Sequence, residues 1–307
     1  MVSGAEPASV APGPPQTWAR ASSVPRYGRG MTALLRVGEP GAEVPVLLRD
    51  GRTYDLRPLT DDVDAAFLAA DGPRRAREAD LPQIDVSGQR VGAPIATPGA
   101  VVCIGQNYAA HAAESGSPPP DRPIVFFKHP NTITGPTDPI LKPPGADSLD
   151  WEVELGVVIG TAAHRVDEAD ALSHVAGYVV GNDVSERTWQ RAESGGQWSK
   201  GKISPSFCPL GPMLVPADKV DPTALHIWSR VNGEQRQDST TGDMVFSVAT
   251  LIADVSRYVR LDPGDLLLTG TPEGVAMSGR YPYLADGDVV EAGIDGLGAH
   301  RSPVVTG

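Results

Sequence analysis

Cysteine is nearly absent from this 307-residue chain, which contains only Cys103 and Cys208. Two thiols are too few for a disulfide framework or for a zinc site built from cysteines alone. Long hydrophobic runs are also missing: apolar residues make up 40% of the chain, but no run approaches the roughly 18–20 residues of a membrane span. No signal-peptide core is visible near the start. These absences predict a cytoplasmic protein that does not bind a membrane.

Positive charge is scarce as well. The chain has 26 Lys and Arg against 38 Asp and Glu, a formal net charge of -12. Domains that bind nucleic acids are usually basic, and anionic lipid surfaces attract basic segments. We therefore expect neither nucleic acid nor a membrane as a partner, although an acidic protein can still bind a small anion at a locally basic site.

Glycine and proline are abundant, with 34 and 30 residues, which indicates frequent turns and short strands. Residues 1–30 contain five prolines and a single acid. Such a segment cannot bury enough apolar surface to offset its ordering entropy. We predict a disordered extension over residues 1–30. A targeting peptide is the weaker alternative, because no amphipathic arginine-rich helix is visible.

Residues 31–95 are predicted to form a small N-terminal α+β domain. Apolar stretches at residues 44–48 and 53–56 flank Asp50-Gly51, a typical hairpin turn. A short helix is predicted over residues 61–70. The charged and then polar segment 73–94 is predicted to be a link to the next domain.

Residues 96–307 are predicted to form a larger, β-rich domain. One helix is predicted over residues 247–259, with Ser247 as its N-cap. Without a regular alternation of strands and helices, a sandwich or roll is favoured over a doubly wound sheet. The predicted strands, each bounded by Gly, Pro, Asn or Asp, are residues 101–104, 124–128, 151–159, 178–181, 213–215, 225–231, 266–269 and 289–294.

The most informative segment for chemistry is the strand that contains Glu152 and Glu154. Side chains alternate along a strand, so the two carboxylates point the same way. Carboxylates this close repel one another unless a cation neutralises them, and Mg²⁺, Mn²⁺ and Ca²⁺ prefer oxygen ligands. The alternative is a solvent-facing strand with two ordinary acids, which the spacing alone favours slightly.

Asp183 follows an apolar strand directly and is the candidate third carboxylate of a metal site. A second interpretation is structural: Asp183 followed by Glu186 three residues later fits a variant of the capping box, with Asp183 as the N-cap of a helix.

His111 and Glu114 are the candidate acid–base pair. Residues three apart are neighbours on a helical turn, and a carboxylate beside an imidazole raises its basicity. Taken alone, this pattern is more often a surface pair. The glycine- and proline-rich residues that follow, 115–121, have the composition of a mobile lid.

Two further segments could bind an anion. Lys200 and Lys202 lie in a glycine-flanked stretch and could hold an anionic substrate; the alternative is a basic turn on an acidic surface. Thr271 lies in a Gly-Thr-Pro turn that ends an apolar strand, where a hydroxyl and backbone N–H groups could bind an anion. The alternative is simply a tight turn.

Together and in this order, these segments resemble the fumarylacetoacetate hydrolase family over roughly residues 100–305. Among its members, bacterial enzymes that act on diketo-deoxy sugar acids or acylpyruvates look most similar. The matching blocks are GQNYxxHxxE at 105–114, DWEVELG at 150–156, GYxVGNDVS at 177–185, GQWxKGK at 196–202, TGDMVFS at 241–247 and PGDLLLTGTP at 263–272.

The resemblance implies a mixed β-sandwich roll, usually a homodimer, with Mg²⁺ or Mn²⁺, or Ca²⁺ as a further possibility. Its metal ligands fall on Glu152, Glu154 and Asp183. Its catalytic residues fall on His111, Glu114 and Lys202. Its substrate-binding residues fall on Gln106, Tyr108, Lys128, Gln190 and Thr271.

The activity that the resemblance implies is hydrolysis of a C–C bond in an acylpyruvate or 2,4-diketo acid, through a metal-stabilised pyruvate enolate. The substrate is a small anionic keto acid. Two alternatives share the enolate chemistry, decarboxylation of oxaloacetate and isomerisation of a hydroxy-dienoate diacid. A third is a β-rich binding protein that uses the acids for structural calcium.

Overall fold

The computed structural model describes residues 30–307, so the extension predicted for residues 1–30 lies outside the described residues except for Gly30. The strands are β1 (Thr32–Val37), β2 (Val44–Arg49), β3 (Arg52–Asp55), β4 (Val101–Gly105), β5 (Ile124–Lys128), β6 (Ile133–Thr134), β7 (Ile140–Lys142), β8 (Leu149–Asp150), β9 (Val153–Ile159), β10 (Val175–Asn182), β11 (Ser185–Glu186), β12 (Cys208–Pro209), β13 (Val215–Pro216), β14 (His226–Val231), β15 (Glu234–Thr240), β16 (Leu266–Leu268), β17 (Val289–Ile294) and β18 (Gly298–Thr306). The α-helices are α1 (Ala65–Ala69), α2 (Gly72–Glu78), α3 (Ala109–Glu114), α4 (Glu168–Ala171), α5 (Arg187–Arg191) and α6 (Val248–Val255). Short 3₁₀ helices are η1 (Pro130–Thr132), η2 (Leu172–His174), η3 (Trp198–Gly201), η4 (Ala217–Lys219), η5 (Thr241–Asp243) and η6 (Ala276–Ser278).

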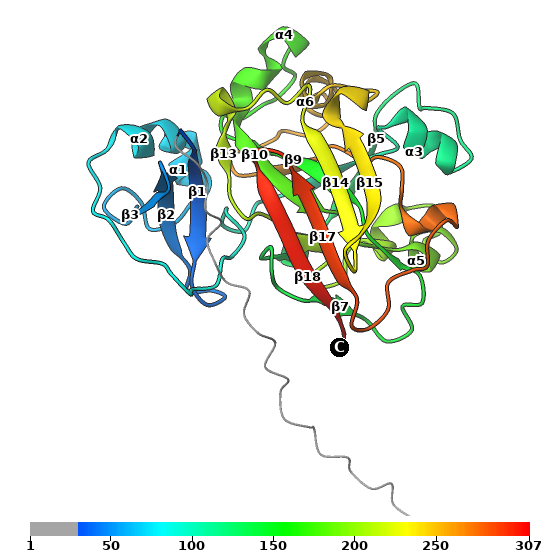
Figure 1. Ribbon diagram of the computed structural model, residues 1–307. Helices are drawn as coiled ribbons and strands as arrows, with labels where there is room; N and C mark the ends of the chain where they lie inside the picture. Colours follow the sequence, from blue (N-terminus) through cyan, green and yellow to red (C-terminus); the bar gives the residue numbers. More distant parts are fainter. Residues whose placement is uncertain (1–29) are drawn as a thin grey trace, which may run out of the picture.

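Two mixed sheets form the larger part of the molecule (Figure 1). The six-stranded sheet has the order β13-β10-β9-β16-β4-β5, and its only parallel pair is β16 with β4. The five-stranded sheet has the order β15-β14-β17-β18-β7, and only β18 and β7 run parallel. The expected β-rich architecture is therefore confirmed, with few and short helices.

A shared hydrophobic core lies between the two sheets. One face of β9 buries Val153, Leu155 and Val157, and these side chains belong to the same cluster as Ile227 of β14 and Ile294 of β17. Burial of large aliphatic side chains on this scale is the main stabilising contribution to such a fold. The core therefore fixes the start of β9, where the candidate carboxylates lie.

The N-terminal strands form a separate three-stranded sheet, β1-β2-β3. Its hairpin turns at Asp50-Gly51, where both residues have positive φ, as the sequence predicts. In Figure 1 this sheet and helices α1 and α2 make up the blue and cyan lobe beside β13. Leu34 of β1 pairs with Leu214, so the lobe is joined to the larger sheet by backbone bonding.

One prediction about the N-terminal part needs correction, and two of the longer strands were not predicted. The segment predicted as a link, residues 73–94, contains most of α2, whose charged sequence buries only a few small side chains and so shows little apolar periodicity. Strands β15 and β18 were not predicted. The sequence of β15 is polar because it is an edge strand with one fully buried side chain, Gln237. In β18 the apolar pattern of the sequence is interrupted by His300, Arg301 and Pro303.

The predicted long helix is confirmed as α6, with Ser247 as its N-cap: the Ser247 hydroxyl accepts from the Thr250 backbone N–H at 3.1 Å. The helix ends at Val255, four residues earlier than predicted, and the chain continues in turns through Tyr258. No helix among residues 30–307 has the length and apolar character needed to cross a bilayer.

His300 joins the two sheets, and its burial predicts a pH effect. Its Nε2 lies 2.9 Å from the Val180 carbonyl oxygen of β10, and burial lowers the pKa of His300 to about 4. Between about pH 6.5 and pH 4 the unfolded chain binds a proton that the folded chain does not, so stability falls as pH falls through this window, by about 3 kcal/mol. We expect the free energy of unfolding of His300→Gln, measured with urea from pH 4 to 7, to depend less steeply on pH than that of the wild type. The exposed His164→Gln should keep the wild-type slope, and an unchanged slope in His300→Gln would contradict the assignment.

Candidate active site

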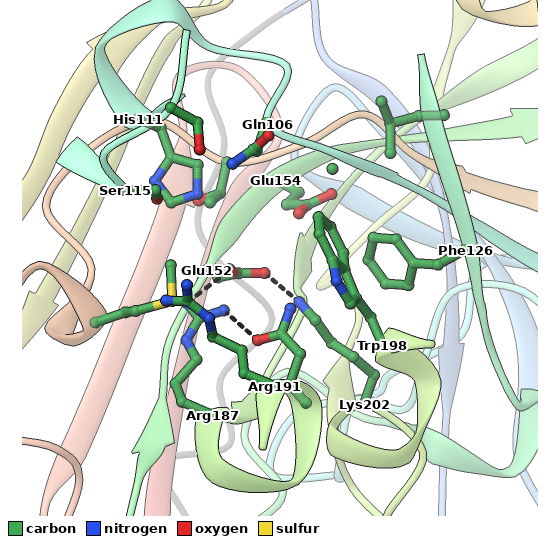
Figure 2. A pocket seen from close by; sticks show the side chains of 16 residues that line it. Gln106, His111, Ser115, Phe126, Glu152, Glu154, Arg187, Arg191, Trp198 and Lys202 are labelled. Carbon is green, nitrogen blue, oxygen red and sulfur yellow. Dashed lines mark hydrogen bonds and ion pairs between the residues drawn. The ribbon is translucent and has the colours of Figure 1, made fainter. Parts of the chain in front are cut away.

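A cavity of about 300 Å³ opens beside the start of β9 and contains most of the predicted site residues (Figure 2). Its walls come from the end of β4, from α3 and the loop after it, from α5 and η3, and from the turn after β16. The lining residues are Ile104, Gly105, Gln106, His111, Ser115, Ser117, Phe126, Glu152, Glu154, Arg187, Gln190, Arg191, Trp198, Lys202, Thr271 and Met277.

Three buried carboxylates cluster at the closed end of this cavity: Glu152 and Glu154 line it, and Asp183 lies behind them. Glu152, Glu154 and Asp183 are at most 5% exposed, and each offers an oxygen that lies within 4.8 Å of the others. The solvent-facing alternative for Glu152 and Glu154 is therefore wrong. The capping alternative for Asp183 is also wrong, because the N-cap of α5 is Glu186, whose carboxylate accepts from the Trp189 backbone N–H.

Two buried lysines neutralise part of this charge. The Lys202 Nζ donates to Glu152 Oε2 at 2.5 Å and to Asp183 Oδ2 at 2.7 Å. The Lys128 Nζ donates to Asp183 Oδ1 at 2.7 Å and to the Val184 carbonyl oxygen at 3.1 Å. Burial opposes the charged form of Lys202, but Asp183 and Glu152 outweigh it and raise its pKa. Lys202 therefore stays protonated and keeps one of its three N–H donors for another partner.

Arg187 is a third buried cation, for which the sequence motifs predicted no role. Its Nε donates to Asp150 Oδ2 at 2.8 Å, and its Nη2 lies 2.6 Å from Glu152 Oε1. Burial opposes ionisation of Glu152, but Arg187 and Lys202 hold the pKa of Glu152 well below its ordinary value. Arg187 lies two residues beyond the GYxVGNDVS block that contains Asp183, so that block did not identify it.

Asp150 anchors Arg187 to the opposite wall of the cavity. Its carboxylate also accepts from the Ala276 and Met277 backbone N–H groups at 2.8 and 3.0 Å, and the residue is fully buried. One side chain therefore fixes both the arginine and the turn that carries Met277.

We expect Asp150→Asn to lower the free energy of unfolding by about 3 kcal/mol, because it weakens a buried ion pair and places an amide donor against N–H donors. Urea unfolding of the metal-free protein measures the effect. Glu234→Gln, which removes an exposed partner of Arg236, should change the value by less than about 1 kcal/mol. Equal effects of the two substitutions would show that Asp150 does not have this anchoring role.

Glu154 differs from the other two carboxylates. No ion pair involves it among the described residues, and its hydrogen-bond partner is the Gly270 backbone N–H at 2.8 Å. Burial, reinforced by Asp183 and Glu152, raises the pKa of Glu154 well above its ordinary value. A buried carboxylate without a cation, beside two others, is the local signal that a metal ion fits here.

His111 and Glu114 lie together on α3, as predicted, and both are largely buried. The His111 Nδ1 is 3.8 Å from Glu114 Oε2, and neither Nδ1 nor Glu114 Oε1 has a hydrogen-bond partner. Burial opposes ionisation of Glu114, but His111 and the Gly274 backbone N–H outweigh it and lower its pKa. The pair is therefore an ionised carboxylate beside an imidazole that lines the cavity (Figure 2), and not a surface pair.

The predicted substrate-binding residues divide into two groups. Gln106, Gln190 and Thr271 line the cavity. The Thr271 hydroxyl already donates to the Val153 carbonyl oxygen and accepts from Gln237, so it has no proton left for a substrate.

The other residues lie behind the cavity wall. Tyr108 is buried and its hydroxyl has no hydrogen-bond partner. Lys128 donates to Asp183 and does not line the cavity. Lys200 points away, with its Nζ on the Glu193 carbonyl oxygen. Lys202 is thus the lysine of this segment that faces the site.

Backbone positions around the cavity are set by close packing. Gly105 lies against the Trp198 ring, and a Cβ atom there would come within 2.3 Å of it. Asn107, for which the sequence motifs predicted no separate role, donates to the Thr269 and Phe246 carbonyl oxygens. It ties the start of α3 to the turn that holds Glu154.

A matched family model covers residues 100–305 and is described as the fumarylacetoacetate (FAA) hydrolase C-terminal domain. A curated relative from Burkholderia multivorans, named "Putative hydrolase", is 50% identical over 272 residues, which is 86% of this chain and 96% of that protein. The matched region contains every predicted site residue.

Solved structures show the same fold. A fumarylacetoacetate hydrolase from Exiguobacterium antarcticum has a TM-score of 0.79 and 34% identity, covering 90% of this chain and 100% of that one. A 5-carboxymethyl-2-hydroxymuconate delta-isomerase from Mycobacterium smegmatis has a TM-score of 0.72 and 34% identity, covering 90% of this chain and 99% of that one. A maleylpyruvate hydrolase from Sphingobium sp. SYK-6, in complex with manganese(II) and pyruvate, has a TM-score of 0.75 and 28% identity, covering 90% of this chain and 99% of that one. These matches confirm the fold that the sequence motifs predict.

Proposed function

The chain belongs to the fumarylacetoacetate (FAA) hydrolase family, and on that premise we propose that it is a divalent-metal-dependent hydrolase that cleaves a C–C bond of an acylpyruvate or 2,4-diketo acid. One observation carries the proposal: Glu152, Glu154 and His111 line one cavity, with Asp183 beside the two glutamates and Glu114 beside the histidine. The carboxylates suit a hard cation, and the pair suits the transfer of a proton from water.

Mg²⁺ or Mn²⁺ is the expected ion, because Glu152, Glu154 and Asp183 offer only oxygen ligands. Bound there, it would supply Lewis-acid polarisation of the keto and carboxylate oxygens of the substrate. The manganese in the maleylpyruvate hydrolase structure, which has 28% identity to this chain, supports this choice.

His111 is the proposed general base. Its Nδ1 faces Glu114, which leaves Nε2 to take a proton from water while the water oxygen bonds to the distal carbonyl carbon. Glu114 stabilises the resulting imidazolium. Cleavage of the C–C bond then moves the electron pair into the pyruvate fragment, and the proton held by His111 returns to its C3 atom, so that pyruvate and a carboxylic acid are the products.

Lys202 stabilises the negative charge that develops on the pyruvate fragment. Its ammonium group is fixed by Glu152 and Asp183 and packs 5.0 Å from the centre of the Phe126 ring, with one donor still available. A fixed donor in a buried site needs no reorganisation during the reaction. Trp198 and Phe126 pack together with ring centres 5.6 Å apart and give this end of the cavity an apolar wall.

The test is a panel of acylpyruvates and oxaloacetate with Mg²⁺ and with Mn²⁺, read by identification of the products. Pyruvate with a new carboxylic acid supports the hydrolase, whereas CO₂ from oxaloacetate supports a decarboxylase. Activity that survives complete removal of metal by EDTA would contradict the metal-dependent mechanism.

An isomerase is the second candidate, supported by the Mycobacterium smegmatis delta-isomerase structure at 34% identity. The same histidine could move a proton between two carbon atoms of a hydroxy-dienoate diacid. Isomerisation leaves the substrate mass unchanged and adds no water, so mass spectrometry of the products in ¹⁸O-labelled water separates the two activities.

A further inference from the structure

Arg191 differs from the other cations that line the cavity. Among the described residues these cations are Arg187, Arg191 and Lys202, and Arg187 and Lys202 each already bind two buried carboxylates. Arg191 is exposed at the end of α5, and its side-chain contact is with the sulfur of Met277, at 3.6 Å. A thioether is a weak acceptor, so the guanidinium keeps nearly all of its capacity for an anion.

The cavity has a closed end and an open end, and Arg191 lies at the open end. Glu154 and Lys202 are each 1% exposed, whereas Ser115 and Ser117 are partly exposed and Arg191 is exposed. In the view of Figure 2, Arg191 lies on the opposite side of Glu152 from Glu154. A substrate whose keto-acid end reaches the buried carboxylates therefore extends its acyl end toward Arg191.

A second polar group of the cavity lining also lacks a partner, on the side of His111 (Figure 2). The Ser115 hydroxyl is buried from solvent, lines the cavity and makes no hydrogen bond. An unpaired buried hydroxyl is costly unless a ligand or water completes it. The cavity therefore offers a neutral donor on the α3 side and, separately, the charged donor Arg191 at the end of α5.

The charge balance of the site points in the same direction. With all groups ionised, five largely buried carboxylates and three buried cations leave two negative charges, which a divalent ion cancels. The carboxylate of an α-keto acid makes the site negative again, so any second carboxylate needs a cation of its own. The groups counted are Glu114, Asp150, Glu152, Glu154, Asp183, Lys128, Arg187 and Lys202.

We propose that Arg191 is a specificity-determining residue that binds a second carboxylate at the acyl end of the substrate, so that the preferred substrate is a dianionic acylpyruvate. This inference rests on the proposed function for the position of the keto-acid end. It adds the class of substrate, and it gives a role in substrate binding to Arg191, which lies outside the sequence motifs shared with the family.

The test compares ligands that differ only in the charge at the distal end. For binding, 2-oxoadipate and its 6-amide are titrated into the Mg²⁺-loaded protein by calorimetry. We expect the wild type to bind the diacid about tenfold more tightly at low ionic strength, as suits a charge-assisted contact that is partly open to solvent. Arg191→Gln should remove this preference, and Arg191→Lys should keep part of it because it keeps the charge.

For catalysis, 2,4-dioxoheptanedioate and its 7-amide are compared in the same variants. Arg191→Gln should raise KM for the diacid about tenfold and leave kcat/KM for the amide within about twofold. Arg257→Gln, which removes an exposed arginine elsewhere on the surface, should behave like the wild type.

Equal binding of the two ligands by the wild type, or a preference that survives in Arg191→Gln, would overturn the inference. If neither acylpyruvate is cleaved, the proposed hydrolase activity fails, but the calorimetric preference and its loss in Arg191→Gln still decide the role of Arg191. The two failures are therefore distinguishable.

Discussion

Glu154→Gln is expected to weaken Mn²⁺ binding about 100-fold or more and to reduce turnover in parallel, while the protein stays folded. The metal affinity of an oxygen-ligand site depends on the number of charged ligands, and this change removes one of three. Because Glu154 forms no ion pair among the described residues, the neutral amide leaves no lysine or arginine without a partner.

The contrast with Asp183 makes Glu154 the better residue for this test. Asp183 accepts from both Lys128 and Lys202 at 2.7 Å, so Asp183→Asn would leave two buried ammonium groups with less compensation. Breaking a buried pair in this way costs about 3–5 kcal/mol. Loss of activity in Asp183→Asn would then report unfolding as much as loss of metal.

Mn²⁺ affinity is measured by calorimetry or by electron paramagnetic resonance, with circular dichroism as the check on folding. Glu193→Gln, which removes an exposed carboxylate just after α5, should retain the affinity and turnover of the wild type. Wild-type Mn²⁺ affinity in Glu154→Gln would show that the three carboxylates are not the metal site.

The sequence predicts the parts of the fold that depend on local patterns. Alternating or continuous apolar residues identify β4, β9 and β10, and a serine cap identifies α6. Strand β15 is missed because its polar residues face solvent at the edge of a sheet, where pairing with β14 and not its own composition holds it in place.

The same distinction applies to the site. Motif order brings Glu152, Asp183 and Lys202 together correctly, since Lys202 donates to both carboxylates beside the cavity. It cannot show that Lys128 and Lys202 share Asp183, or that Asp150 holds Arg187, because these contacts join segments that lie 19 to 55 positions apart. Partners of buried charges are set by packing in three dimensions, and periodicity carries no information about them.

His111→Ala is expected to reduce kcat about 10²- to 10⁴-fold, the usual contribution of a general base, while Mn²⁺ affinity changes by less than about threefold. His111 lies on α3 and is not one of the three clustered carboxylate residues, so removal of the imidazole should leave the metal ligands in place. The control is His164→Ala, an exposed histidine that should behave like the wild type.

The result also bears on the reaction class, because of how Glu114 is held. Its Oε2 accepts from the Gly274 backbone N–H at 3.0 Å, so the carboxylate that supports His111 is fixed to the turn opposite α3. A base fixed in this way is suited to activating water at one position. If His111→Ala lost Mn²⁺ affinity together with turnover, the histidine would be part of the metal site, and the separation between metal ligands and base would be wrong. If His111→Ala kept full turnover, proton transfer by His111 would be excluded for the hydrolase and for the isomerase alike, and a reaction that needs no base at this position, such as decarboxylation, would be favoured.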